Sequence, residues 1–141
     1  MPPFPRSDPY IRIPAVLFGL IFLGFGTNML LRPEPAFTAS FGFPWPTAST
    51  SATTKGLSTA DHSVALTAFC QMFGAKEVFE GVALLTTAWW GNKRHLGIVM
   101  FVAGLGAGVD GWVVKGTVGE GEWGHWGYGA VLFALGALGL V

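Results

Sequence analysis

Charged residues are scarce in this sequence. Only 11% of the 141 residues are Asp, Glu, Lys or Arg, less than half of the roughly 25% usual for soluble domains. The formal net charge is zero, so no basic surface favours nucleic acid. Cys70 is the single cysteine, which excludes a disulfide framework within the chain. The chain is therefore apolar: 51% of its residues are hydrophobic, and 21 residues are glycine.

The familiar motifs of cofactor chemistry are also missing. There is no HExxH motif and no cysteine pair, so a metal site has little support. There is no Walker loop, no GxGxxG after a strand and no GxSxG. A haem would need an axial histidine deep inside an apolar stretch, and none of the three histidines lies there. We therefore expect neither a cofactor nor a metal.

Four apolar stretches cover most of the chain, at about residues 13–31, 63–90, 96–114 and 126–141. Each is near the ~20 residues that a helix needs to cross ~30 Å of hydrocarbon. Arg32-Pro33 ends the first, because proline cannot continue a helix and arginine anchors at the interface. The pattern predicts an all-α fold, a four-helix transmembrane bundle that forms one integral membrane domain over residues 1–141.

The connection between the first two stretches is long. Its first half is apolar, and a Ser/Thr-rich run at residues 47–54 follows. Long connections often act as lids over a site. We interpret the first half as a segment that lies on or dips into the membrane surface and could cover a pocket. The alternative is an interfacial anchor without catalytic meaning. Its aromatic residues are Phe37, Phe41, Phe43 and Trp45.

Charged side chains nevertheless occur inside two of the predicted spans. A charge at mid-bilayer costs about 2.5–3.5 kcal/mol, so such residues normally face a bundle interior and mark a site. Lys76 and Glu80 are spaced i, i+4 and can pair, which leaves Glu77 with Asp110. Two carboxyls close together in low dielectric cannot both ionise easily, so one should hold a proton. They would supply an acid and a base in one dry pocket. A structural ion-pair network is the alternative.

Helix rise places further polar groups near this pocket. At ~1.5 Å per residue, Glu77, Asp110 and Asn28 lie at similar depths of roughly 20 Å. His125 opens the fourth stretch from the opposite surface. The predicted site therefore has two sets of residues. The catalytic set is Glu77, Asp110, Glu80 and Lys76, and the substrate-binding set is Asn28, His125, Trp112 and Gln71.

The segment MFGAKEVFEGVALL resembles the second-span signature of the domain of unknown function 4267 family. Asp110-Gly111-Trp112, His125-Trp126-Gly127 and the first stretch ending in Arg32-Pro33 are similar to the same pattern. These are short four-span membrane proteins of fungi and actinobacteria. Lys76 stands where many relatives are expected to have Arg, which keeps the charge but loses the guanidinium fork.

The resemblance implies a function. Some fungal relatives lie in polyketide or terpenoid biosynthetic clusters, where small membrane proteins are assigned to the opening of epoxides. We therefore expect a cofactor-independent epoxide hydrolase or cyclase of fungal specialised metabolism, a multi-pass protein of the endoplasmic reticulum. Its partners would be a lipophilic substrate and the bilayer, and a homo-oligomer is left open. The alternatives are a membrane terpenoid cyclase or isomerase that uses a protonated carboxyl, and a non-enzymatic lipid-binding or scaffold bundle.

Overall fold

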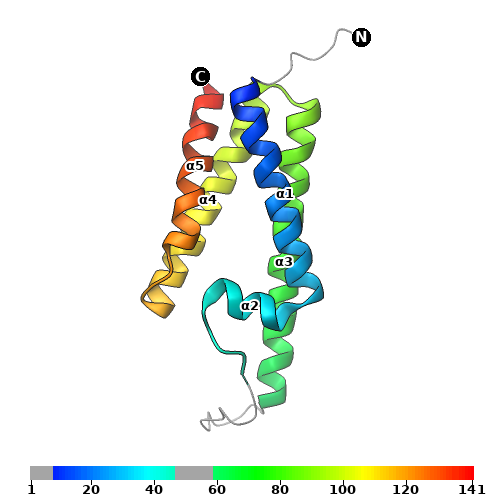
Figure 1. The fold of residues 1–141 in the computed structure, drawn as a ribbon, viewed down its shortest axis with the longest axis vertical. Helices are drawn as coiled ribbons and strands as arrows, with labels where there is room; N and C mark the ends of the chain where they lie inside the picture. The colour runs from blue at the N-terminus through cyan, green and yellow to red at the C-terminus, as the bar shows by residue number, and fades with distance from the viewer. Residues whose placement is uncertain (1–7, 47–58) are drawn as a thin grey trace.

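Five helices and no strand make up the residues that the computed structural model describes, 8–46 and 59–141 (Figure 1). This confirms the predicted all-α class. Two of the helices, α1 and α4, are long and apolar enough to cross a membrane. The helices are α1 (Pro9–Leu31), α2 (Pro33–Phe41), α3 (Thr59–Trp90), α4 (Lys93–Val118) and α5 (Trp123–Leu140).

The helices extend beyond the apolar stretches because polar residues cap their ends. The Asp8 carboxylate accepts a hydrogen bond from the Tyr10 backbone N–H (3.1 Å) at the start of α1. The Asn92 side chain accepts one from the His95 N–H (3.0 Å) at the start of α4. Such side-chain acceptors satisfy N–H groups that have no partner in the first turn. Each predicted stretch lies within one helix, apart from the last residue, Val141.

Hydropathy alone did not predict that part of the long connection forms a helix, α2. Arg32 breaks α1 with φ −138°, and Pro33 then starts α2 at the position where a helix tolerates proline. Gly42 ends α2 with φ +71°, a conformation that favours glycine. Ala36 on α2 is buried against Met29 and Cys70. The apolar segment therefore packs against α1 and α3. The Ser/Thr-rich run at residues 47–54 lies outside the described residues.

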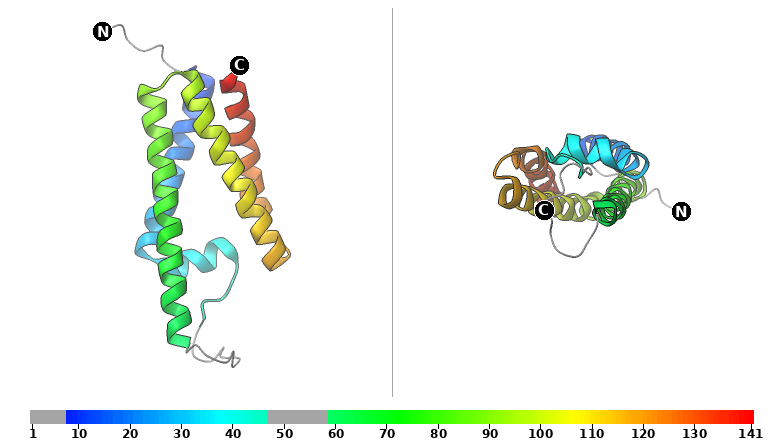
Figure 2. Two further views of the ribbon diagram at one scale, coloured as in Figure 1. Left: turned by 180° about the vertical axis from the view of Figure 1, so that it is seen from behind. Right: turned by 90° about the horizontal axis from the view of Figure 1, so that it is seen from below.

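The long helices form two pairs, α1 with α3 and α4 with α5. The pairs lie together at the end where α1 begins and α5 ends, and they diverge toward the other end, where α2 crosses between them (Figures 1 and 2). Few contacts join α3 to α4 or α1 to α5. The divergence leaves room between the pairs for the cavities described below.

Glycine sets the close packing within each pair. A Cβ atom added to Gly26 would lie 2.5 Å from the carbonyl oxygen of Gly74 across the α1–α3 contact. One added to Gly104 would lie 2.5 Å from the backbone nitrogen of Phe133 across the α4–α5 contact. Such small-residue contacts let helix backbones approach closely. Gly19 and Gly81 in the first pair and Gly97, Gly136 and Gly139 in the second make similar contacts.

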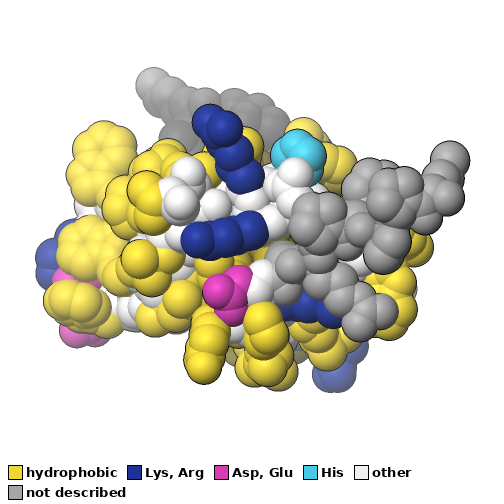
Figure 3. All heavy atoms as spheres, turned by 90° about the horizontal axis from the view of Figure 1, so that it is seen from above, with side chains coloured by type: hydrophobic (Ala, Val, Ile, Leu, Met, Phe, Trp, Pro, Cys, Tyr) yellow, Lys and Arg dark blue, Asp and Glu magenta, His cyan; other side chains and the backbone are white. Residues whose placement is uncertain are grey.

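The sides and the ends of the bundle differ in character. Large hydrophobic side chains are exposed along all four long helices, including Leu17, Phe79, Val102 and Val131. Seen from above, Lys, Arg and His side chains gather on the end surface, with hydrophobic side chains around it (Figure 3). The lateral surface is therefore apolar and this end is polar.

Candidate functional site

The charged residues of the predicted site meet at the ammonium group of Lys76. Its Nζ lies 3.0 Å from Glu77 Oε1, 3.2 Å from Asp110 Oδ2 and 3.6 Å from Glu80 Oε1. Helix α3 supplies Lys76, Glu77 and Glu80, and α4 supplies Asp110. The structure thus brings together all four residues predicted as catalytic. It also changes the expected pairing, because Lys76 contacts all three carboxylates and lies closest to Glu77.

Burial differs among these side chains. Glu77 is the most enclosed, with 4% of its side chain exposed, against 22% for both Glu80 and Asp110 and 37% for Lys76. The ammonium of Lys76 also lies 4.8 Å from the centre of the Phe73 ring, within the range of a cation–π interaction. Three carboxylates around one ammonium leave this cluster with an excess of negative charge when all are ionised.

Glu77 lines a cavity of about 340 Å³ between α1, α3 and α5, which we call the first cavity. His125 and Tyr128 of α5 line it too, so three side chains able to exchange protons converge there. The Tyr128 hydroxyl lies 3.4 Å from His125 Nδ1. The remaining walls are mostly aromatic: Phe18, Phe22 and Phe25 of α1 and Phe73 of α3. An apolar cavity with a few convergent polar groups is the usual form of a small-molecule site.

Asp110 lines a different cavity, of about 350 Å³, which we call the second cavity. The expectation that Glu77 and Asp110 face one pocket therefore differs from the structure, in which Lys76 links carboxyls on two neighbouring cavities. Phe73 lines both cavities. Phe41 of α2 lines the second cavity and stacks on the His125 ring with a centroid distance of 6.0 Å. Helix α2 thus contributes a wall to the site, which the alternative of an interfacial anchor does not require.

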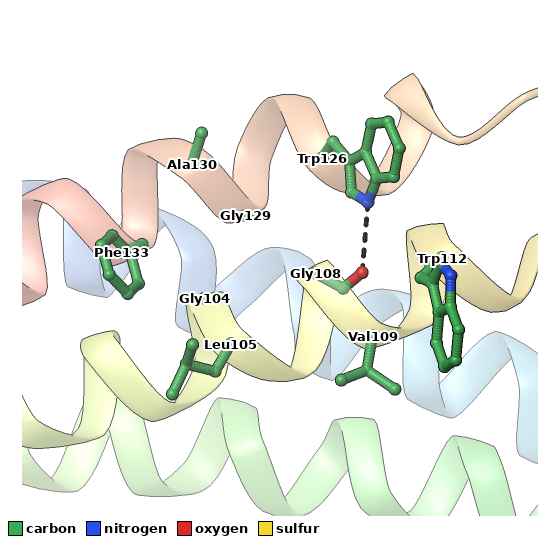
Figure 4. Close-up of a pocket in the computed structure, with 9 residues that line it drawn as sticks. All are labelled: Gly104, Leu105, Gly108, Val109, Trp112, Trp126, Gly129, Ala130 and Phe133. Carbon is green, nitrogen blue, oxygen red and sulfur yellow. Dashed lines mark hydrogen bonds between the residues drawn. The ribbon is translucent and has the colours of Figure 1, made fainter. Parts of the chain in front are cut away.

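Trp112 does not belong to this site. It is 72% exposed and lines a groove of about 590 Å³ on the α4–α5 face. Figure 4 shows this groove, where the Trp126 indole N–H donates a hydrogen bond to the Gly108 carbonyl oxygen (3.1 Å). Two positions along a helix turn a side chain by about 200°, so Trp112 points away from Asp110. None of the described residues that line the groove is charged.

The structure also leaves Asn28 and Gln71 outside the two cavities. Both side chains are exposed, and neither lines the first or the second cavity. Asn28 lies two positions after Gly26, which faces α3, so its side chain points away from that contact. Depth along a helix was therefore a poor guide, because the side a residue faces decides whether it reaches the site. His125 differs from these two, since it is buried and lines the first cavity.

Tyr128 is the residue that the sequence analysis missed. It lies three positions after His125, a spacing that puts both side chains on one face of a helix. That spacing could have identified it. Its ring also packs against Phe22, with centroids 5.9 Å apart, and so joins α5 to α1.

The family resemblance can be tested against known proteins. Residues 19–139 match the family described as Domain of unknown function (DUF4267). The chain belongs to this family. No curated protein and no solved structure gives a match.

The DUF4267 match includes the charged cluster and the polar residues of both cavities. The description of the family names no activity. In the described residues, no group of three or more His, Cys, Asp or Glu side chains is arranged to hold a metal ion. The cavities are therefore the features of this DUF4267 protein that bear on its function.

Proposed function

We propose that this protein is a membrane-embedded enzyme that opens the epoxide of a lipophilic polyketide or terpenoid, by hydrolysis or cyclisation. One observation carries the proposal: the buried Glu77 lines one cavity together with His125 and Tyr128, and the other walls of that cavity are mainly aromatic. This site offers proton donors and acceptors to a substrate that is otherwise apolar. Fungal specialised metabolism and the endoplasmic reticulum are the setting that the family resemblance implies.

Membrane embedding is part of the proposal. Large exposed apolar surfaces mark membrane or protein contacts, and here they extend along all four long helices. At ~1.5 Å per residue, the 18 residues of α5 span ~27 Å, close to the thickness of the hydrocarbon core. We infer that α3 and α5 cross the bilayer together with α1 and α4. A substrate dissolved in the lipid could then enter the site sideways.

The reaction needs one group that accepts a proton and one that donates a proton. Glu77 would accept the proton of the attacking oxygen, which belongs to water or to a hydroxyl of the substrate. That oxygen forms a bond to an epoxide carbon, and the carbon–oxygen bond of the ring breaks. The departing oxygen takes a proton from Tyr128, which lies against His125. Water gives a diol, whereas an internal hydroxyl gives a cyclic ether. Positioned acid–base groups of this kind contribute about 10²–10⁴-fold to a rate.

The other charged residues would support Glu77. Lys76 holds the Glu77 carboxylate at 3.0 Å and so orients it. Asp110 and Glu80 contact the same ammonium and share its charge.

A terpenoid cyclase or isomerase is a second candidate, and the aromatic walls favour it. A protonated carboxyl would start a carbocation, which ring faces stabilise through cation–π interactions. The two reactions leave different products. Epoxide opening yields a diol or an ether, whereas a cyclisation that starts at an alkene yields a carbocycle without added oxygen.

The test uses the purified protein in lipid nanodiscs with trans-stilbene oxide and 2,3-oxidosqualene in ¹⁸O-labelled water. Mass spectrometry would show a diol with one ¹⁸O atom if water is the nucleophile. Glu77→Gln should abolish this product. Glu34→Gln should retain it, because Glu34 is exposed on α2 and lines neither cavity. Folded wild-type protein that converts neither probe would contradict the proposal and favour a lipid-binding bundle.

A further inference from the structure

Neither Glu77 nor Tyr128, the groups that exchange protons in the proposed reaction, lines the second cavity. Asp110 is the one charged residue among the described residues that line it. Thr117 also lines it, but its hydroxyl already donates a hydrogen bond to the Val113 carbonyl oxygen (2.7 Å). Most of the wall is phenylalanine, from α2, the segment after it, and α3: Phe37, Phe41, Phe43, Phe69 and Phe73.

These rings form a connected aromatic surface. Phe37 lies 5.3 Å from Phe41 and 6.1 Å from Phe43, measured between ring centroids, and Phe41 lies 5.7 Å from Phe73. The negative face of an aromatic ring attracts a cation. Phe73 already has the Lys76 ammonium 4.8 Å from its centroid. The wall of the cavity therefore suits positive charge.

The charges around the second cavity also favour a bound cation. Asp110 shares the ammonium of Lys76 with two other carboxylates. Lys76 is the only cation that pairs with them in the part of the chain that the structure describes. The Asp110 side chain is 22% exposed and lines the second cavity, so a second cation could lie beside its carboxylate.

We propose that the second cavity binds the quaternary ammonium group of an amphiphile. The phenylalanine rings would surround the methyl groups, and the Asp110 carboxylate would balance the charge. The volume of about 350 Å³ would hold such a head group together with the first part of its apolar chain. A metal ion would not suit this wall, because hard cations need several oxygen ligands. Binding here does not depend on epoxide opening, since Glu77, His125 and Tyr128 line the other cavity.

The test compares two esters that differ in one atom. Hexanoylcholine carries a quaternary nitrogen where 3,3-dimethylbutyl hexanoate carries a neutral carbon. Calorimetry would measure both with the protein in digalactosyldiacylglycerol nanodiscs, which contain no ammonium group, and empty nanodiscs would correct for partitioning. The choline ester should bind at least roughly tenfold more tightly, as a desolvated cation–π contact beside a carboxylate allows. Equal affinities would overturn the proposal.

Two variants test whether the preference for the choline ester arises in the second cavity. Asp110→Asn should bring the two affinities to within about twofold, whereas Glu120→Gln, on the exposed α4–α5 connection, should leave the tenfold ratio unchanged. Should Asp110→Asn fail to fold, Phe43→Leu alters the wall without touching the ion cluster, and it should lower the ratio too. If the tenfold ratio of affinities persists in a folded Asp110→Asn or Phe43→Leu variant, the proposal is wrong.

The ligand could be a lipid head group or a free compound, and the membrane composition separates the two sources. In phosphatidylcholine nanodiscs a bound head group would compete, and the apparent affinity for hexanoylcholine would fall. An unchanged affinity would instead identify a free amphiphile as the ligand.

Discussion

Lys76 on α3 and Asp110 on α4 form an ion pair, with Nζ and Oδ2 3.2 Å apart. The pair joins two helices that have few other contacts. Each belongs to a different glycine-packed pair, so this polar link helps to fix how the two halves of the bundle sit together. The position of the link also sets the geometry of both cavities, because Glu77 and Asp110 each line one of them.

Lys76→Met should destabilise the protein. The change removes the one ammonium that three carboxylates share and leaves them unpaired. We expect a loss of about 1–3 kcal/mol, below the value for a fully buried pair because about a third of the lysine side chain is exposed. Thermal unfolding followed by circular dichroism in nanodiscs would measure it. Lys76→Arg, which keeps the charge, should lie much closer to wild type. Equal stability of Lys76→Met and wild type would show that the cluster does not hold the helices.

Gly26→Ala should disrupt the α1–α3 contact. The new methyl group would meet the backbone of Gly74 and Val78, at 2.5 and 2.7 Å, and backbone atoms cannot rotate away. Overpacking of this kind costs roughly 1–3 kcal/mol. Gly24→Ala is the matched control, since a Cβ there meets nothing within 4 Å and alanine favours the helix. The unfolding temperature should therefore fall for Gly26→Ala and should rise or stay the same for Gly24→Ala. Equal losses in both would refute close packing at Gly26.

Tyr128→Phe should lower turnover without much loss of stability. The hydroxyl lies 3.4 Å from His125 Nδ1, a long contact that adds little to folding. The aromatic ring, which packs on Phe22, is retained. In the proposed reaction Tyr128 gives a proton to the departing oxygen, so loss of its hydroxyl should reduce kcat by about 10²-fold or more. Product formation from the probe epoxide, compared with the unfolding temperature, separates the two effects. A parallel fall in both would assign Tyr128 a structural role only.

The sequence predicted the helices well because their apolar stretches are long and Arg32-Pro33 marks a clear end. It also identified the four charged residues, since charge is rare in apolar helices. It could not predict α2, which depends on local backbone geometry at Pro33 and Gly42. Nor could it predict which cavity each carboxyl faces, because that depends on how the helix pairs diverge.

Three residues of the predicted substrate-binding set lie on the exposed faces of their helices. Asn28, which was placed by depth, and Gln71 and Trp112 have exposed side chains and lie outside both cavities. The buried face of α1 contains Phe22, Gly26 and Met29, and this periodicity could have excluded Asn28. Tyr128 would have been found by the same reasoning, from its spacing to His125.

A salt bridge between the last turn of α4 and the residue before α5 should make the stability of the protein depend on pH. Lys115 Nζ lies 2.9 Å from Glu122 Oε1, and Glu122 is the residue just before α5 begins. The hydrogen bond that Lys115 donates lowers the pKa of the Glu122 carboxyl below its ordinary value of 4.5. A lowered pKa in the folded state means that the ionised form stabilises the fold. That contribution is complete above the ordinary pKa and is lost as the pH falls through the folded value.

Glu122→Gln should therefore be less stable than wild type at pH 7, and the difference should shrink as the pH falls below 4.5. The unfolding temperatures of both proteins would measure this difference, with readings between pH 3 and pH 7 at intervals of about half a pH unit. Subtracting the two curves removes the contributions of all other acidic residues. Glu120→Gln is the control, because Glu120 is exposed on the same connection, and its curve should follow that of wild type. A difference between Glu122→Gln and wild type that stays constant across this range would show that packing, and not the charge of Glu122, stabilises the turn.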